Sequence, residues 1–177
     1  MSKITKNKNK DVGYERFMKT VNPRLDSVLM VLKAHLLAEY YIDQLISLEI
    51  RRGDIILNNS FNFYQKLIVI KSLDLMENYL WDSIEALNRL RNRCAHDMDY
   101  KISETDIDKL GFPQGREYAK EKERFVLDKK GLLHHTLIGV IAPLDGLLRH
   151  VIKHHGHNQS EDSKIKNIPP KKLKTKK

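Results

Sequence analysis

Residues 83–100 read SIEALNRLRNRCAHDMDY, and their spacing is the strongest structural signal in this chain. At about 100° per residue, the apolar side chains of this segment fall on one side of a helix and form a core stripe. The stripe consists of Ile84, Leu87, Leu90, Cys94 and Met98. Polar and charged side chains occupy the remaining surface, so the pattern predicts an amphipathic helix over 82–97.

Helical patterns extend from this segment toward both ends of the chain. We expect the first long helix to begin at the Asn22-Pro23 start signal and to end at Gly53. Ser60 is the expected cap of the second helix, and Pro143 should kink or split the last one. The expected long helices cover residues 23–52, 60–72, 82–97 and 130–155.

Shorter elements complete the predicted fold. Residues 74–81 suggest a short helix or turn, and the pattern from Ser103 to Asp106 is a capping box that opens a short helix ended by Gly111. Residues 111–130 are rich in charge and should form a surface loop. The sequence therefore predicts an all-α protein, an up-and-down bundle of four long helices plus short helices.

Net charge is concentrated at the two ends of the chain. The chain has 32 lysines plus arginines and 23 aspartates plus glutamates, which gives a formal net charge of +9. The ends account for this excess, and the segment 11–160 is formally neutral. We expect one domain over 13–157, with disordered Lys-rich tails over 1–12 and 158–177. These tails would either contact nucleic acid non-specifically or serve solubility alone.

Composition excludes several other classes of protein. The single Cys94 rules out an intrachain disulfide and a cysteine-based zinc knuckle. No window approaches about 18 consecutive apolar residues, and the polar first residues do not resemble a secretory signal, so we expect a cytoplasmic protein without a membrane span. His150 and His154 have helical spacing but belong to no metalloprotease motif, so we expect neither a metal site nor a cofactor.

Arg91 is the anomalous residue of the helix over 82–97. It lies at the edge of the apolar stripe, where an unpaired charge would be costly. Glu39 and Asp43 are the matching anomalies, because they interrupt the apolar face of the first long helix one turn apart. We expect at least one of these acids to pair with Arg91 or to face the same cleft. The arrangement would be either a structural ion pair between helices or part of a functional site.

A second polar group lies beside Arg91 on the same predicted helix. Asn92 and His96 are one turn apart on the flank of the apolar stripe, and Arg89 and Arg93 are expected to face solvent. A histidine can transfer protons near neutral pH, and an arginine can stabilise a phosphate that gains negative charge. Together they supply what metal-independent RNA cleavage needs. Alternatively, His96 only interacts with the dipole at the end of its helix.

The segment Arg91-Asn92-Arg-Cys-Ala-His96 resembles the R-N-x-x-x-H motif of the HEPN superfamily. The segment KAHLLAEYYIDQLI in the first long helix is similar to the branch that includes mannitol operon repressor-like proteins. The resemblance covers about residues 22–155, and it implies a helical bundle and a homodimer that brings two copies of the motif into one cleft. In nuclease members of the superfamily, the positions of Arg91 and His96 carry metal-independent RNA cleavage, and the position of Asn92 helps to orient the site.

Two functions are consistent with this resemblance. The first is a metal-independent endoribonuclease in defence or stress response, with RNA as its partner, Arg91 on the phosphate and His96 as base or acid. The expected supporting residues are Asn92, Arg93, Glu39 and Asp43. The second is a non-catalytic regulatory or interaction bundle, similar to the mannitol repressor-like branch. Many toxin members have a tyrosine where this chain has Met98, which argues against a toxin-like activity.

Overall fold

The computed structural model describes the backbone of residues 12–165 and the side chains of residues 15–155. Every regular element in that part of the chain is a helix, so the prediction of an all-α protein is confirmed. The elements are α1 (Val12–Thr20), α2 (Ser27–Glu49), α3 (Gly53–Asn58), α4 (Phe63–Ser72), α5 (Asn78–His96), α6 (Glu104–Gly111), the 3₁₀ turn η1 (Phe112–Gln114), α7 (Arg116–Arg124) and α8 (Lys129–Ile165).

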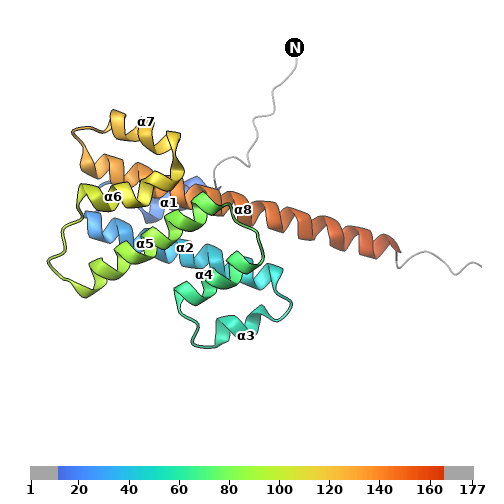
Figure 1. Cartoon of the computed structure of the whole chain (residues 1–177). Coiled ribbons are helices and arrows are strands. Elements are labelled where there is room, and N and C mark those ends of the chain that lie inside the picture. Colours follow the sequence, from blue (N-terminus) through green and yellow to red (C-terminus); the bar gives the residue numbers. More distant parts are fainter. Residues whose placement is uncertain (1–11, 166–177) are drawn as a thin grey trace, which may run out of the picture.

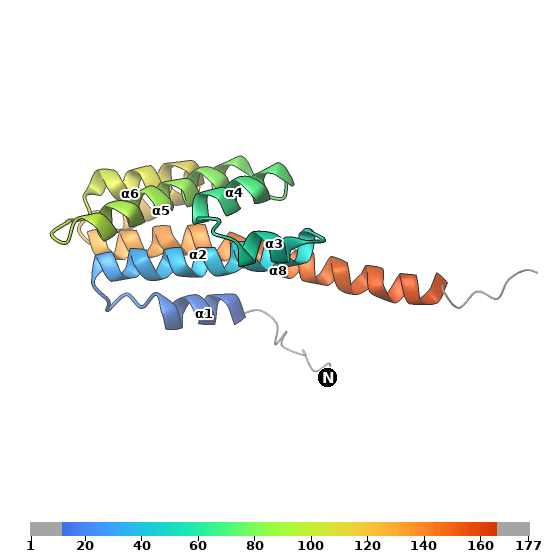
Figure 2. The same cartoon turned by 90° about the horizontal axis from the view of Figure 1, so that it is seen from below.

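Three long helices form the centre of the fold. Helices α2 and α8 lie side by side and run in the same direction, while α5 packs on them in the opposite direction (Figure 1). Helices α4 and α6 lie on the same side as α5, and α1 covers the opposite side (Figure 2). The C-terminal part of α8 extends beyond the other helices in both views.

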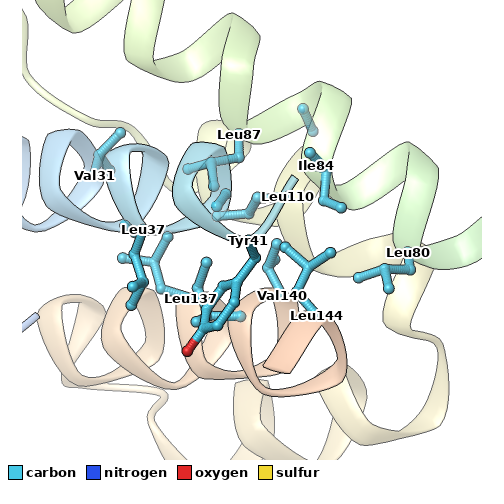
Figure 3. Packing of buried hydrophobic residues seen from close by; sticks show 14 of the residues in the cluster. Val31, Leu37, Tyr41, Leu80, Ile84, Leu87, Leu110, Leu137, Val140 and Leu144 are labelled. Atoms are coloured by element: carbon cyan, nitrogen blue, oxygen red, sulfur yellow. The ribbon is translucent and has the colours of Figure 1, made fainter. Parts of the chain in front are cut away.

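The hydrophobic core lies where α2, α5 and α8 meet (Figure 3). Its labelled members are Val31, Leu37 and Tyr41 of α2, Leu80, Ile84 and Leu87 of α5, Leu110 of α6, and Leu137, Val140 and Leu144 of α8. Full burial of one large apolar side chain is worth about 1.5–3 kcal/mol, so this contact is the main source of stability. It also anchors α5, the helix that presents Arg91 and His96.

Side-chain caps decide where α4 and α6 begin. Asn62 accepts a hydrogen bond from the amide of Gln65 at 3.0 Å, and the Gln65 side chain accepts one from the amide of Asn62 at 2.9 Å. The expected cap at Ser60 is wrong, because the residue three positions after Ser60 is a phenylalanine that cannot complete this reciprocal box. The capping box of Ser103 and Asp106 at the start of α6 is confirmed.

Three segments differ from the expected pattern. Helix α5 begins at Asn78, so part of the expected turn over 74–81 belongs to the main helix. Gly53 does not simply end the first long helix but begins α3, and a side chain there would meet the carbonyl of Ile46. Residues 116–124 form α7 where a loop was expected. In each case packing against a neighbouring helix overrides a weak local signal.

Helix α8 is longer than the sequence predicts. It continues through Pro143 and past the expected domain boundary at residue 157 to Ile165. A proline inside a helix costs about 3 kcal/mol, and the packing of α8 on α2 offsets this cost. Helix α1 begins at Val12, also inside an expected tail. The remainder of both tails lies outside the described residues.

Residues Lys129–His155 of α8 are long and apolar enough to cross a membrane by length and composition. This is weak evidence for a span, because core helices pass the same test and about half of this segment is buried within the fold. The apolar residues of α8 pack on α2, as expected for a core helix (Figure 3).

Candidate active site

Glu39 and Asp43 pair with Lys66 of α4. The Lys66 Nζ atom lies 3.0 Å from Glu39 Oε1 and 2.9 Å from Asp43 Oδ1. Burial disfavours the charged form of Lys66, but its hydrogen bonds to Asp43 and Glu39 outweigh burial and raise its pKa. The first alternative, an ion pair between one of these acids and Arg91, is wrong for the described residues, whereas the second, that one of them faces the same cleft as Arg91, stays a prediction. The spacing along α2 places both carboxylates on one face, but it cannot show which helix supplies the cation.

Arg91 therefore keeps its charge free of carboxylates. It is half-buried on α5, and its Nη1 donates to Asn92 Oδ1 at 3.1 Å. Within residues 15–155, the structure shows no ion pair to Arg91. An arginine has five N–H donors, so the bond to Asn92 leaves most of them available to an anion.

His35 of α2 is a site residue that the sequence analysis missed. It is 3% exposed, its Nε2 lies 3.1 Å from Asn88 Oδ1, and its ring packs 4.3 Å from that of Phe63. Burial lowers the pKa of His35, the charge of Arg91 lowers it further, and the Asn88 hydrogen bond and Glu39 act in the opposite direction. The charges of Arg91 and Glu39 thus act on the pKa of the same buried imidazole in opposite directions.

Spacing could have identified His35 and Asn88. His35 precedes Glu39 by one turn on α2, and Asn88 precedes Asn92 by one turn on α5. Each residue extends a polar row that was recognised only in part, because a lone histidine on an apolar helix has no signature of its own. The Nδ1 atom of His35 is buried without a hydrogen-bond partner in the described part of the chain.

Four polar residues form a continuous row along α5, which we call the α5 ridge: Asn88, Arg91, Asn92 and His96. Asn92 and His96 are exposed, and His96 is the last residue of the helix. No hydrogen bond or ion pair to the His96 ring is present in the described structure. A free imidazole and a largely free guanidinium therefore project from one helix.

Arg93 does not simply face solvent, contrary to expectation. Its Nη1 lies 2.7 Å from Oδ1 of Asp106, whose side chain is almost fully buried. The other oxygen of Asp106 accepts hydrogen bonds from the Tyr100 hydroxyl at 2.7 Å and from the Ser103 amide at 2.8 Å and hydroxyl at 2.7 Å. Burial alone would raise the pKa of Asp106, but these hydrogen bonds and Arg93 hold it below its usual value. The network fixes the turn that follows His96.

The end of α5 also corrects the expected core stripe. Cys94 is buried, and burial raises the pKa of its thiol, as expected for a core cysteine. Met98 is instead 97% exposed, because the helix ends at His96 and the extended backbone of Asp97 redirects the chain. The rings of His150 and His154 have centres 4.3 Å apart and are tilted by 56°, and the described residues contain no group of three or more side chains suited to a metal.

Comparisons with protein-family models, with curated proteins and with solved structures found no match to this chain. Function is therefore inferred from the chemistry of the α5 ridge and its surroundings.

Proposed function

We propose that this chain is a HEPN-like, metal-independent endoribonuclease that acts through Arg91 and His96. The free charge of Arg91 supports this proposal most directly. Lys66 pairs with Glu39 at 3.0 Å and with Asp43 at 2.9 Å, and neither acid forms an ion pair with the guanidinium of Arg91 in the described structure. Because a guanidinium binds phosphate oxygens strongly, the arrangement suits a backbone phosphate of RNA.

The chemistry requires only a base, an acid and a cation. His96 would accept the proton of a ribose 2′-hydroxyl, whose oxygen then attacks the adjacent phosphorus atom. The bond to the 5′-oxygen breaks, that oxygen takes a proton from an imidazolium, and a 2′,3′-cyclic phosphate remains. Arg91 would stabilise the negative charge that develops on the phosphate, and Asn92 would hold the Arg91 side chain through its 3.1 Å hydrogen bond.

The site needs a second copy of the chain, and we propose that the helical bundle forms a homodimer. On one helix, Arg91 and His96 point about 140° apart, so a single protomer does not direct both at one atom. The exposed apolar side chains of Leu29, Leu36 and Tyr40 form a row along α2, the helix that contacts α5. Leu36 alone is 61% exposed. We propose that this α2 row packs on the partner and brings Arg91 of one protomer near His96 of the other.

A regulatory or interaction protein remains the second candidate. The exposed α2 row and the formally neutral segment 11–160 favour it, because a protein-binding surface needs apolar area and no basic footprint. In that case Arg91 and His96 would serve only to shape a binding face.

Cleavage of mixed RNA in EDTA separates the two functions. We expect the wild type to produce fragments with cyclic phosphate ends, and His96→Ala and Arg91→Ala to lose this activity at unchanged thermal stability. His154→Ala removes another exposed histidine and should cleave like the wild type. Equal cleavage by wild type and His96→Ala, or none by a wild type shown to be dimeric, would contradict the nuclease proposal. Leu36→Glu should yield monomers by light scattering and lose cleavage as well.

A further inference from the structure

A recess lies next to the turn that follows α5. Its volume is about 300 Å³, which is at the small end of the range for ligand pockets. The first residues of α2 and α8 line one side of it, and the turn between α5 and α6 lines the other. We call it the lysine pocket, after Lys101, Lys129 and Lys130 in its lining.

The lining of the lysine pocket has an excess of positive charge. Lys101, Lys129 and Lys130 are exposed, and none has an ion-pair partner among residues 15–155. The single acid in the lining is Asp26, and one of its oxygens already accepts the amide of Val28 at 2.8 Å. Aspartates cap the N-termini of both helices, because Asp26 accepts the amide of Val28 and Asp128 Oδ1 accepts the amide of Gly131 at 2.8 Å. The positive charge of the pocket therefore comes from the three lysines.

The floor of the pocket is apolar and includes one aromatic ring. Ile102, Ile107 and Leu133 are buried beneath it, and Tyr100 lies at its edge. The hydroxyl of Tyr100 is held by Asp106 at 2.7 Å, so the ring has a fixed position. An apolar floor with an aromatic edge suits a flat base, and a rim of lysines suits the phosphate attached to it.

The lysine pocket is close to the candidate catalytic histidine. Tyr100 follows His96 by four residues, and four residues of fully extended chain span at most about 14 Å. The network around Asp106 holds this short connection in place. A strand that meets His96 can therefore place a neighbouring nucleotide in the pocket.

We infer that the lysine pocket binds one nucleotide of a single-stranded RNA, next to the phosphate at the α5 ridge. This inference rests on the proposed nuclease function for the identity of the strand. The base lies on the apolar floor beside Tyr100, and the phosphate contacts the three lysines. A free mononucleotide has the same chemistry, and the experiment below distinguishes it from a strand.

Binding is measured on full-length His96→Ala protein, so that cleavage does not interfere. The probes are a labelled single-stranded RNA oligonucleotide and adenosine monophosphate. The pocket variant replaces Lys101, Lys129 and Lys130 by glutamine. The control variant removes the same charge elsewhere, by replacing the exposed residues Lys19, Lys71 and Lys120 by glutamine. A third variant, Ser27→Trp, fills the pocket without a change of charge.

We expect the pocket variant to bind the RNA about tenfold more weakly at 0.1 M salt. The slope of its log affinity against log salt concentration should correspond to about two fewer phosphate contacts. The control variant should stay within about twofold of its parent, and Ser27→Trp should bind weakly like the pocket variant. Equal losses in the pocket and control variants would overturn the inference, because net charge alone would explain them. It would also be overturned if the lysines affected only the mononucleotide. If the wild type does not cleave RNA but its RNA binding depends on the three lysines, the nuclease proposal is refuted and the inference that the lysine pocket binds RNA holds.

Discussion

Replacement of Asp106 by asparagine tests the network that fixes the end of α5. Asp106 is 4% exposed, accepts three hydrogen bonds on one oxygen and pairs with Arg93 at 2.7 Å on the other. Asparagine has the same shape, but its amide group would point two donors at groups that are themselves donors. The change therefore removes the charge and at least one hydrogen bond without creating a large cavity.

The expected cost follows from the partners of Asp106. A hydrogen bond to a charged group contributes about 1.5–3 kcal/mol, and loss of one partner of a buried ion pair costs about 3–5 kcal/mol. Arg93 is 42% exposed and can be rehydrated, which lowers the penalty. We therefore expect Asp106→Asn to lower the free energy of unfolding by about 2–3 kcal/mol. For a chain of this size the melting temperature should fall by about 4–12 °C.

The assay is thermal and urea unfolding followed by circular dichroism between pH 3 and pH 7. The folded pKa of Asp106 lies below its reference value of 3.8, so its contribution is present above that pH and is lost as the pH falls further. The difference between wild type and Asp106→Asn should therefore shrink below about pH 4. Asp99→Asn alters an exposed carboxylate in the same turn and should change stability by less than about 0.5 kcal/mol. A melting temperature within about 2 °C of wild type, or a difference that stays constant down to pH 3, would refute this account.

Three further substitutions test other parts of the structure. Lys66→Met should cost about 2–3 kcal/mol in urea unfolding, because it leaves two partly buried carboxylates unpaired, and an unchanged midpoint would contradict the ion triad. Gly111→Ala should cost about 1–3 kcal/mol in the same assay, because the added methyl group would overlap the ring of Tyr118; wild-type stability would show that the ring can move freely. Burial lowers the folded pKa of His134, so its stabilising contribution is lost as the pH falls below 6.5. His134→Gln can retain the hydrogen bond to the Val21 carbonyl, and it should reduce the loss of stability between pH 7.5 and 5.5; an equal loss in both proteins would exclude His134 as its source.

Only the features of the candidate site that lie within a single helix could be predicted from the sequence. The positions of Arg91, Asn92 and His96 on one polar flank follow from helical periodicity, and the structure retains that order. The ion-pair partner of Glu39 could not be predicted from the sequence, because a carboxylate can pair with a cation from any helix that packs beside it. Lys66 lies among the mainly apolar residues of α4, and nothing in the sequence connects its charge with the acids of α2.

The residue that caps α4 could also not be predicted from its type alone. Ser60 and Asn62 are both good helix caps by type, and local sequence alone favours neither strongly. Gln65 decides between them, because its side chain returns a hydrogen bond to Asn62. Pro143 is the opposite case, in which a strong local signal for a break is overridden by packing along α8.

The all-helical class, the core face of α5 and the capping box at Ser103 follow from local sequence, because each depends on residues within a few turns of one another. The choice of ion-pair partners, in contrast, depends on how the helices pack against one another. Among the side chains of residues 15–155, Lys66 pairs with the two acids of α2, Asp106 pairs with Arg93, and Arg91 has only the amide oxygen of Asn92 as its partner. Ion pairs form between atoms a few ångströms apart, and helical periodicity specifies a face without specifying its neighbour.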